Sequence, residues 1–186
     1  MKVKQYDIIV VGAGPGGSSA ALTAVQKGAE VIVLEEHPQI GIPRHCTGFL
    51  PDSAGYNAAI RRMVGENYII RPSTLVRCFG PDGKIIQENP MGENGACLIR
   101  REEFDREWAK LAVQAGADIV LNTRVTGLLK EKGRIAGVTT NSRAMPEVRG
   151  KLVIAAGGYR ALHSGIPKQA VPTRSLPHIL SFKFYH

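Results

Sequence analysis

The sequence is poor in cysteine and has no long run of apolar residues. Its three cysteines, Cys46, Cys78 and Cys97, are too few and too widely spaced for a disulfide framework or a zinc site, and they favour a reducing compartment such as the cytoplasm. The apolar run near the N-terminus is interrupted by Asp7 and by glycines, which argues against a signal peptide or membrane span there. Any membrane contact is therefore expected to be peripheral.

Aromatic residues make up only 6% of the chain, and charges of both signs are scattered along it. The 24 Lys and Arg against 16 Asp and Glu give a formal net charge of +8, which favours anionic partners such as phosphates or an acidic membrane surface. No basic run, RNA-binding aromatic signature or helix-turn-helix pattern predicts nucleic-acid binding. The five scattered histidines predict no metal site. With 44% apolar residues, the composition is that of a globular protein with one sizeable core.

Glycine, in contrast, is concentrated at one place near the N-terminus, in the stretch YDIIVVGAGPGGSSAA at residues 6–21. Residues 7–11 are apolar and β-branched after the acid, as in a strand buried on both faces of a parallel sheet. Residues 15–27 then predict a helix that ends at Gly28, and AEVIVLEE supplies a second buried strand. The pattern predicts a β-α-β unit.

The turn inside this unit has the spacing G-x-G-x-x-G, with Pro15 and Gly16 between its last two glycines. Gly12 makes the tight turn, Gly14 lets the backbone approach a pyrophosphate, and Gly17 allows the helix to pack closely on the strand. The helix N-terminus then offers amide groups and partial positive charge to the phosphates. Nicotinamide and flavin cofactors both use such a turn.

Glu35 stands at the end of the second predicted strand. A carboxylate there accepts hydrogen bonds from ribose hydroxyls and repels a 2'-phosphate, so the adenosine of FAD or NAD fits better than that of NADP.

The rest of the chain alternates loops, strands and one long helix. Residues 37–51 are expected to form a loop, residues 53–63 a short helix, and residues 68–87 extended segments with a hairpin turn at 80–84. A strand, an amphipathic helix and another strand follow within residues 96–120. The residues expected on the apolar face of that helix are Phe104, Trp108, Leu111 and Ala115.

The C-terminal third is expected to be mainly β. TRVTGLLKEKGRIAGVTT predicts two strands turned at Lys132 and Gly133, and KLVIAAGG predicts one more buried strand. This β-meander argues against a nicotinamide-only dehydrogenase. The final LPHILSFKFYH is expected to be an unpaired edge strand that could support association with another chain.

Three segments, DIIVVGAGPGGSSAA, VIVLEEHPQIGIPRHCTGFL and LIRREEFDREWAKLA, resemble the geranylgeranyl reductase family of FAD-dependent oxidoreductases, especially its archaeal digeranylgeranylglycerophospholipid reductase-like members. The resemblance covers most of residues 6–166. It implies an α/β fold: a Rossmann-like FAD-binding domain of the glutathione-reductase or flavin-monooxygenase type, with a β-meander, formed by residues 1–66 and 96–166. Residues 67–95 and 167–186 would belong to a second, substrate-side β-sheet.

The resemblance also implies an activity. Reduced FAD would reduce isolated double bonds of an isoprenoid lipid, such as an archaeal ether lipid, while an external donor (ferredoxin, a deazaflavin or NADPH) would supply the electrons.

The site residues that the resemblance implies begin with the glycine turn and Glu35, which would hold the pyrophosphate and the adenosine ribose. Arg44, Cys46 and Thr47 would lie along the ribityl chain and the flavin ring, with Cys46 as a candidate proton donor. Arg101, in the pattern R-x-x-F-D, would reach the phosphate and ribityl region. The backbone at Val125 would meet the adenine.

Two departures from the family keep other functions open. Gly157 stands where the family pattern has an acid, and the chain is roughly half the family's length. The chain could therefore be a truncated, non-catalytic FAD-binding remnant or one half of a split enzyme. Another flavoprotein of the monooxygenase type, such as a hydroxylase or halogenase, is a further alternative, although the Cys-Thr-Gly loop speaks against it.

Overall fold

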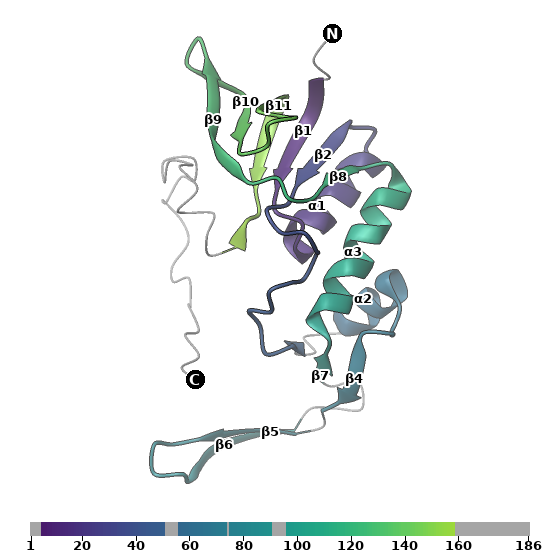
Figure 1. The fold of residues 1–186 in the computed structure, drawn as a ribbon. Helices are drawn as coiled ribbons and strands as arrows, with labels where there is room; N and C mark the ends of the chain where they lie inside the picture. The colour runs from purple at the N-terminus through teal and green to yellow at the C-terminus, as the bar shows by residue number, and fades with distance from the viewer. Residues whose placement is uncertain (1–4, 51–55, 74, 91–95, 159–186) are drawn as a thin grey trace.

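The structure is a computed structural model that describes residues 5–50, 56–73, 75–90 and 96–158 (Figure 1). The edge strand expected at the C-terminus lies outside these residues. So do residues 167–186 of the predicted substrate-side sheet and the expected start of the short helix at residues 53–55.

A six-stranded sheet forms the centre of the molecule, in the order β8-β2-β1-β11-β10-β9. Four neighbouring strands are parallel: β8 (Asp118–Val120), β2 (Val31–Leu34), β1 (Gln5–Val11) and β11 (Glu147–Ala155). The other two pair antiparallel: β10 (Arg134–Thr140) with β11, and β9 (Val125–Glu131) with β10. The predicted parallel sheet with a β-meander is confirmed.

Helices cover one face of this sheet (Figure 1). The helix α1 (Pro15–Gln26) packs on β1 and β2, and α3 (Arg101–Ala115) packs against α1. The short helix α2 (Tyr56–Val64) contacts α3. The two longer helices are each followed by a glycine with positive φ, Gly28 (φ 84°) after α1 and Gly116 (φ 113°) after α3. A residue with a β-carbon would be strained in this backbone conformation.

The core has two parts, one on each face of the sheet. On the helical face, Val10 and Val33 pack with Phe104 and Trp108 of α3. On the other face, Ile9 and Ile32 are covered by valines of the meander strands, Val125, Val138 and Val148. The meander therefore replaces a second helical layer at this point.

The structure also has two smaller sheets. One has three strands, β3 (Phe49–Leu50), β7 (Cys97–Ile99) and β4 (Ile69–Pro72). The other is the hairpin of β5 (Leu75–Phe79) and β6 (Ile85–Pro90), which extends away from the rest of the molecule (Figure 1). The Gly80 amide donates to the Lys84 carbonyl oxygen at 2.8 Å, which confirms the predicted hairpin turn.

Two burial predictions are wrong. Ala115 is exposed, because the buried face of α3 is rotated toward Asp105, Ala109 and Ala112. Apolar periodicity does not indicate this rotation, because two of the buried residues of α3, Glu102 and Asp105, are carboxylates. In β11, Leu152 is 52% exposed, since α1 packs on β1 and β2.

Candidate functional site

The glycine turn joins β1 to α1, and its glycines have two different surroundings. A β-carbon on Gly12, which has φ 99°, would lie 2.7 Å from the Ala156 carbonyl oxygen, and one on Gly17 would collide with the Gly12 carbonyl. A β-carbon on Gly14 or Gly16 would meet nothing within 4 Å. The protein's own packing therefore requires glycine at positions 12 and 17, whereas Gly14 and Gly16 border open space that a ligand can enter.

The N-terminus of α1 faces this open space. Gly14 is the N-cap residue and has no side chain to cap the helix, and Pro15 follows at the first helical position. The first amides of a helix have no intrahelical acceptor, and the helix dipole adds partial positive charge at this end. A pyrophosphate fits these donors, so this part of the chain suits a dinucleotide.

Glu35 is buried directly beside the turn. One carboxylate oxygen, Oε2, accepts from the Ala13 amide at 2.8 Å. The other, Oε1, accepts from the His37 amide at 3.0 Å and lies 2.7 Å from His37 Nδ1. A carboxylate can accept about four hydrogen bonds, so Glu35 keeps capacity for ribose hydroxyls while it holds the turn.

The segment before β9 runs alongside the end of β2. The Thr123 amide donates to the Glu35 carbonyl oxygen at 2.8 Å, and the Asn122 amide donates to the His37 carbonyl oxygen at 3.1 Å. Val125 follows, with its side chain buried in the core. Val125 thus begins β9 two residues after the Thr123 contact with Glu35, and its contact with the adenine stays a prediction.

The loop after β2 is fixed to α3 and β7 by two glycines. Gly41 has φ 80°, and a β-carbon there would lie 2.6 Å from the Glu102 Cα. Gly48 has φ 76°, and a β-carbon there would collide with the Ile99 carbonyl oxygen. The Ile99 amide also donates to the Gly48 carbonyl oxygen at 2.7 Å. Both ends of this loop are therefore held closely against neighbouring backbone.

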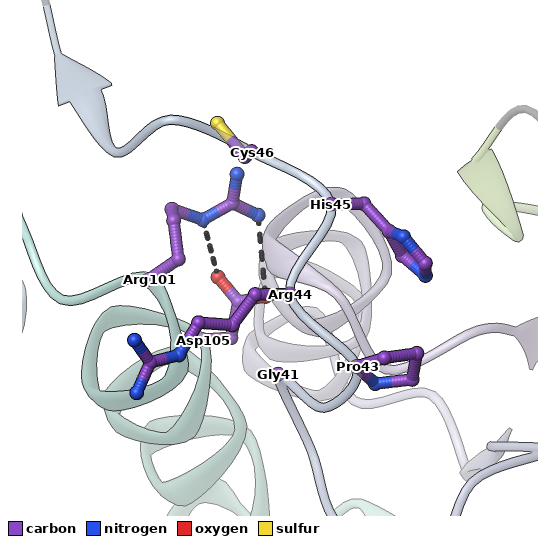
Figure 2. Close-up of a pocket in the computed structure, with 7 residues that line it drawn as sticks. All are labelled: Gly41, Pro43, Arg44, His45, Cys46, Arg101 and Asp105. Atoms are coloured by element: carbon purple, nitrogen blue, oxygen red, sulfur yellow. Dashed lines mark hydrogen bonds and ion pairs between the residues drawn. The ribbon is translucent and has the colours of Figure 1, made fainter. Parts of the chain in front are cut away.

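Between these glycines the loop and α3 enclose a pocket of about 210 Å³ (Figure 2). It is lined by Gly41, Pro43, Arg44, His45, Cys46, Arg101 and Asp105. The structure thus brings Arg101 of α3 together with Arg44 and Cys46 of the loop, which are distant from it in the sequence. Thr47 is exposed and is not among the lining residues.

Each arginine of the pocket is paired with a buried carboxylate of α3. Arg44 Nη2 lies 2.6 Å from Glu102 Oε1. Arg101 binds Asp105 with two donors, Nε to Oδ1 at 2.9 Å and Nη2 to Oδ2 at 3.2 Å. The Arg101 guanidinium is therefore held by two contacts before any ligand binds, whereas Arg44, which is 66% exposed, has a single one.

These pairs shift the pKa values of their members. Burial lowers the pKa of the Arg101 guanidinium, but the Asp105 carboxylate and, to a smaller extent, the Cys46 side chain raise it more, so the net shift is upward. Burial raises the pKa of Asp105, and Glu102 and Glu35 add to this, while Arg101 opposes it.

Sequence reasoning did not find Glu102 and Asp105. The i,i+4 spacing of Arg101 and Asp105 on a helix was a usable signal. No local pattern links Arg44 to Glu102, because the ion pair depends on how the loop folds over α3. Gly157, where an acid was expected, lies at the end of β11 beside Gly12.

Within the ranges that the structure describes, no group of three or more His, Cys, Asp or Glu residues is arranged to hold a metal ion. No helix among these residues is long and apolar enough to cross a membrane.

Comparison with known proteins identifies the family. The model of the FAD dependent oxidoreductase family matches residues 7–162. The chain belongs to this family. The FAD cofactor expected from the sequence is thereby confirmed, while the individual binding residues remain predictions.

Curated relatives carry the name that the sequence resemblance suggested. The chain is 37% identical to a digeranylgeranylglycerophospholipid reductase of Methanocella arvoryzae over 162 residues, which are 84% of this chain and 40% of that protein. A reductase of the same name from Thermoplasma acidophilum is 34% identical, over 86% of this chain and 41% of its own length. The chain thus spans about two fifths of these relatives. The resemblance to the geranylgeranyl reductase family is confirmed.

A shorter relative and two solved structures complete the comparison. An uncharacterized protein in the nifH2 5' region of Methanosarcina barkeri is 33% identical, and the match covers 84% of both chains. The crystal structure of a geranylgeranyl bacteriochlorophyll reductase-like protein from Thermoplasma acidophilum superposes with a TM-score of 0.74 at 34% identity, covering 85% of this chain and 40% of that one. A flavin-dependent brominase gives 0.62 at 25% identity, covering 83% and 39%.

Proposed function

We propose that this chain binds FAD and serves the reduction of isolated double bonds in the isoprenoid chains of an ether lipid. The observation that carries the proposal is that the open glycine turn and the buried Glu35 carboxylate lie together at the carboxyl ends of β1 and β2. The loop after β2 then runs from there to the arginine pocket on α3. This arrangement occurs in a chain 37% identical to a digeranylgeranylglycerophospholipid reductase.

The residues have separate tasks in binding. The amides of the glycine turn hold the pyrophosphate, and Glu35 binds the adenosine ribose. The backbone at Val125 borders the adenine. Arg44 and Arg101 lie toward the phosphate and ribityl region, and Thr47 lies farther along the same loop.

The reaction requires a hydride and a proton. Reduced FAD, which the glycine turn, Glu35 and Arg101 would hold, would supply the hydride to one alkene carbon. The Cys46 thiol, exposed beside Arg101, is the candidate donor of the proton to the other carbon, and it regains a proton from solvent. An external donor, such as ferredoxin, a deazaflavin or NADPH, then returns two electrons. The lipid is reached by peripheral contact with the membrane.

The second candidate is an FAD-binding module without turnover of its own, either a remnant or one half of a split enzyme. It is favoured by Gly157, which lies beside Gly12 where the family pattern has an acid. In either case the hairpin of β5 and β6 is proposed to belong to the substrate-side sheet.

Flavin titration and reoxidation test the two candidates. The purified chain is mixed with FAD, reduced without oxygen, and given a geranylgeranyl ether lipid or its saturated counterpart. Reoxidation by the unsaturated lipid alone supports the reductase. Binding of FAD without reoxidation favours the module, and failure to bind FAD contradicts both. Cys46→Ala should slow the reoxidation, whereas Cys97→Ala, at a buried cysteine that does not line the pocket, serves as the control.

A further inference from the structure

Asp105 holds the Arg101 guanidinium from one side only. The bidentate contact uses Nε and Nη2, so the Nη1 amino group is outside the pair. Figure 2 shows that this group extends toward the Cys46 side of the pocket, whereas the Asp105 carboxylate lies on the opposite side. The guanidinium is therefore fixed between the helix and the loop.

Burial and the two hydrogen bonds together hold the Arg101 guanidinium in one orientation. The Asp105 side chain is 8% exposed and that of Arg101 is 26% exposed. Two parallel hydrogen bonds fix both the position and the plane of a guanidinium, which a single contact does not do. Asp105 thus determines which edge of Arg101 faces the pocket.

The other carboxylates nearby do not duplicate this contact. Glu102 is paired with Arg44, and Glu35 is bonded to Ala13 and His37. Both lie close enough to disfavour a second negative charge at Asp105. A buried carboxylate in such surroundings stays ionised only with a cation fixed against it, so Asp105 and Arg101 act as a unit.

We propose that Asp105 is a positioning residue for the cofactor: it aims the Nη1 edge of Arg101 at the anionic phosphate and ribityl part of FAD. The inference rests on the proposed FAD binding by this chain. It assigns to Asp105 an effect on FAD affinity that acts only through Arg101. Fixing the arginine before FAD arrives reduces the side-chain entropy lost on binding.

A double-mutant cycle tests the proposal, with FAD affinity measured by quenching of flavin fluorescence on the full chain. Asp105→Asn and Arg101→Met should each raise the dissociation constant about tenfold, and the double variant should also raise it about tenfold, because the second change removes nothing further. Glu103→Gln, an exposed acid of the same helix turn that pairs with Arg106 at 3.2 Å, is the matched control and should bind FAD as the unsubstituted chain does.

Additive effects, about a hundredfold in the double variant, would overturn the positioning role while leaving FAD binding intact. An unchanged dissociation constant in Asp105→Asn would do the same. If the unsubstituted chain does not bind FAD, the proposed function fails and this inference fails with it. Circular dichroism checks that each variant folds, and Asp105→Glu, which keeps the charge, replaces Asp105→Asn in the cycle if the latter does not fold.

Discussion

The Glu35 carboxylate accepts a hydrogen bond from the Ala13 amide at 2.8 Å, which ties the end of β2 to the middle of the glycine turn. One side chain is thus placed both to shape the pyrophosphate turn and to meet the ribose. The conformation of the turn and the affinity for the adenosine half of FAD should therefore change together.

Replacement of Glu35 by glutamine tests this coupling. The amide keeps one acceptor oxygen but loses the charge, so the free energy of unfolding should fall by about 1 kcal/mol and the dissociation constant for FAD should rise about tenfold. Urea denaturation and a flavin titration measure the two effects. Glu36→Gln, at the next position, is the control, and an equal loss of affinity there would contradict the role of Glu35.

The glycines of the turn should separate folding from binding. Gly17→Ala should reduce the free energy of unfolding by about 2 kcal/mol, because its β-carbon would collide with the Gly12 carbonyl. Gly14→Ala should change stability by less than about 1 kcal/mol, because nothing lies within 4 Å of its β-carbon, yet it should weaken FAD binding. Denaturation and titration of both variants decide this. A Gly14→Ala protein with unchanged FAD affinity would place the pyrophosphate elsewhere.

Removal of Arg44 should destabilise the protein through Glu102. The Glu102 side chain is 8% exposed and would keep a buried charge without its cation, so we expect Arg44→Ala to cost about 1 to 2 kcal/mol of unfolding free energy. The loss stays below that of a fully buried pair because Arg44 is 66% exposed. In the Arg44→Ala background, a second change, Glu102→Gln, should restore most of the lost unfolding free energy. Arg77→Ala, in the exposed pair with Glu88, should have no measurable effect.

Tyr68 should make stability fall at alkaline pH. Burial raises its pKa to about 12, from 10.0 in an unfolded chain. Between these two values the folded state retains a proton that the unfolded state loses, so folding is favoured below pH 10 and this contribution disappears as the pH rises toward 12. The difference in stability between the protein and Tyr68→Phe should therefore change by on the order of 2 kcal/mol across this range.

At neutral pH the same variant should be at least as stable as the protein. The Tyr68 hydroxyl is buried and has no hydrogen-bond partner among the described residues, so its removal leaves no polar group behind. Tyr6→Phe is the contrasting variant, because the Tyr6 hydroxyl donates to Asp118 at 2.9 Å. Greater destabilisation by Tyr68→Phe than by Tyr6→Phe would show that the Tyr68 hydroxyl has a partner.

The features that the sequence predicted correctly are those that depend on neighbouring residues. The glycine turn follows from steric limits at Gly12 and Gly17, and the β9–β10 turn follows from Lys132 (φ 49°) and Gly133 (φ 78°) in the left-handed region. The strands β1 and β2 were predicted in the same way, each from a short run of apolar residues within the strand itself.

The features that it missed depend on residues distant in the chain. Asp105 and Glu102 are buried because each is paired with an arginine, and with them the buried face of α3 is rotated away from Ala115. The exposure of Leu152 similarly depends on where α1 lies, which no pattern within β11 could indicate.

Gly41 and Gly48, which lie in close contact with neighbouring backbone, make residues 42–47 a segment that can be replaced as a unit. Because both ends of this loop lie against the backbone of α3 and β7, a hexapeptide of equal length that keeps the arginine at position 44 for Glu102 can replace residues 42–47 without moving the scaffold. Replacing residues 42–47 by such a segment from a related flavoprotein should place that protein's side chains at the same positions beside α3.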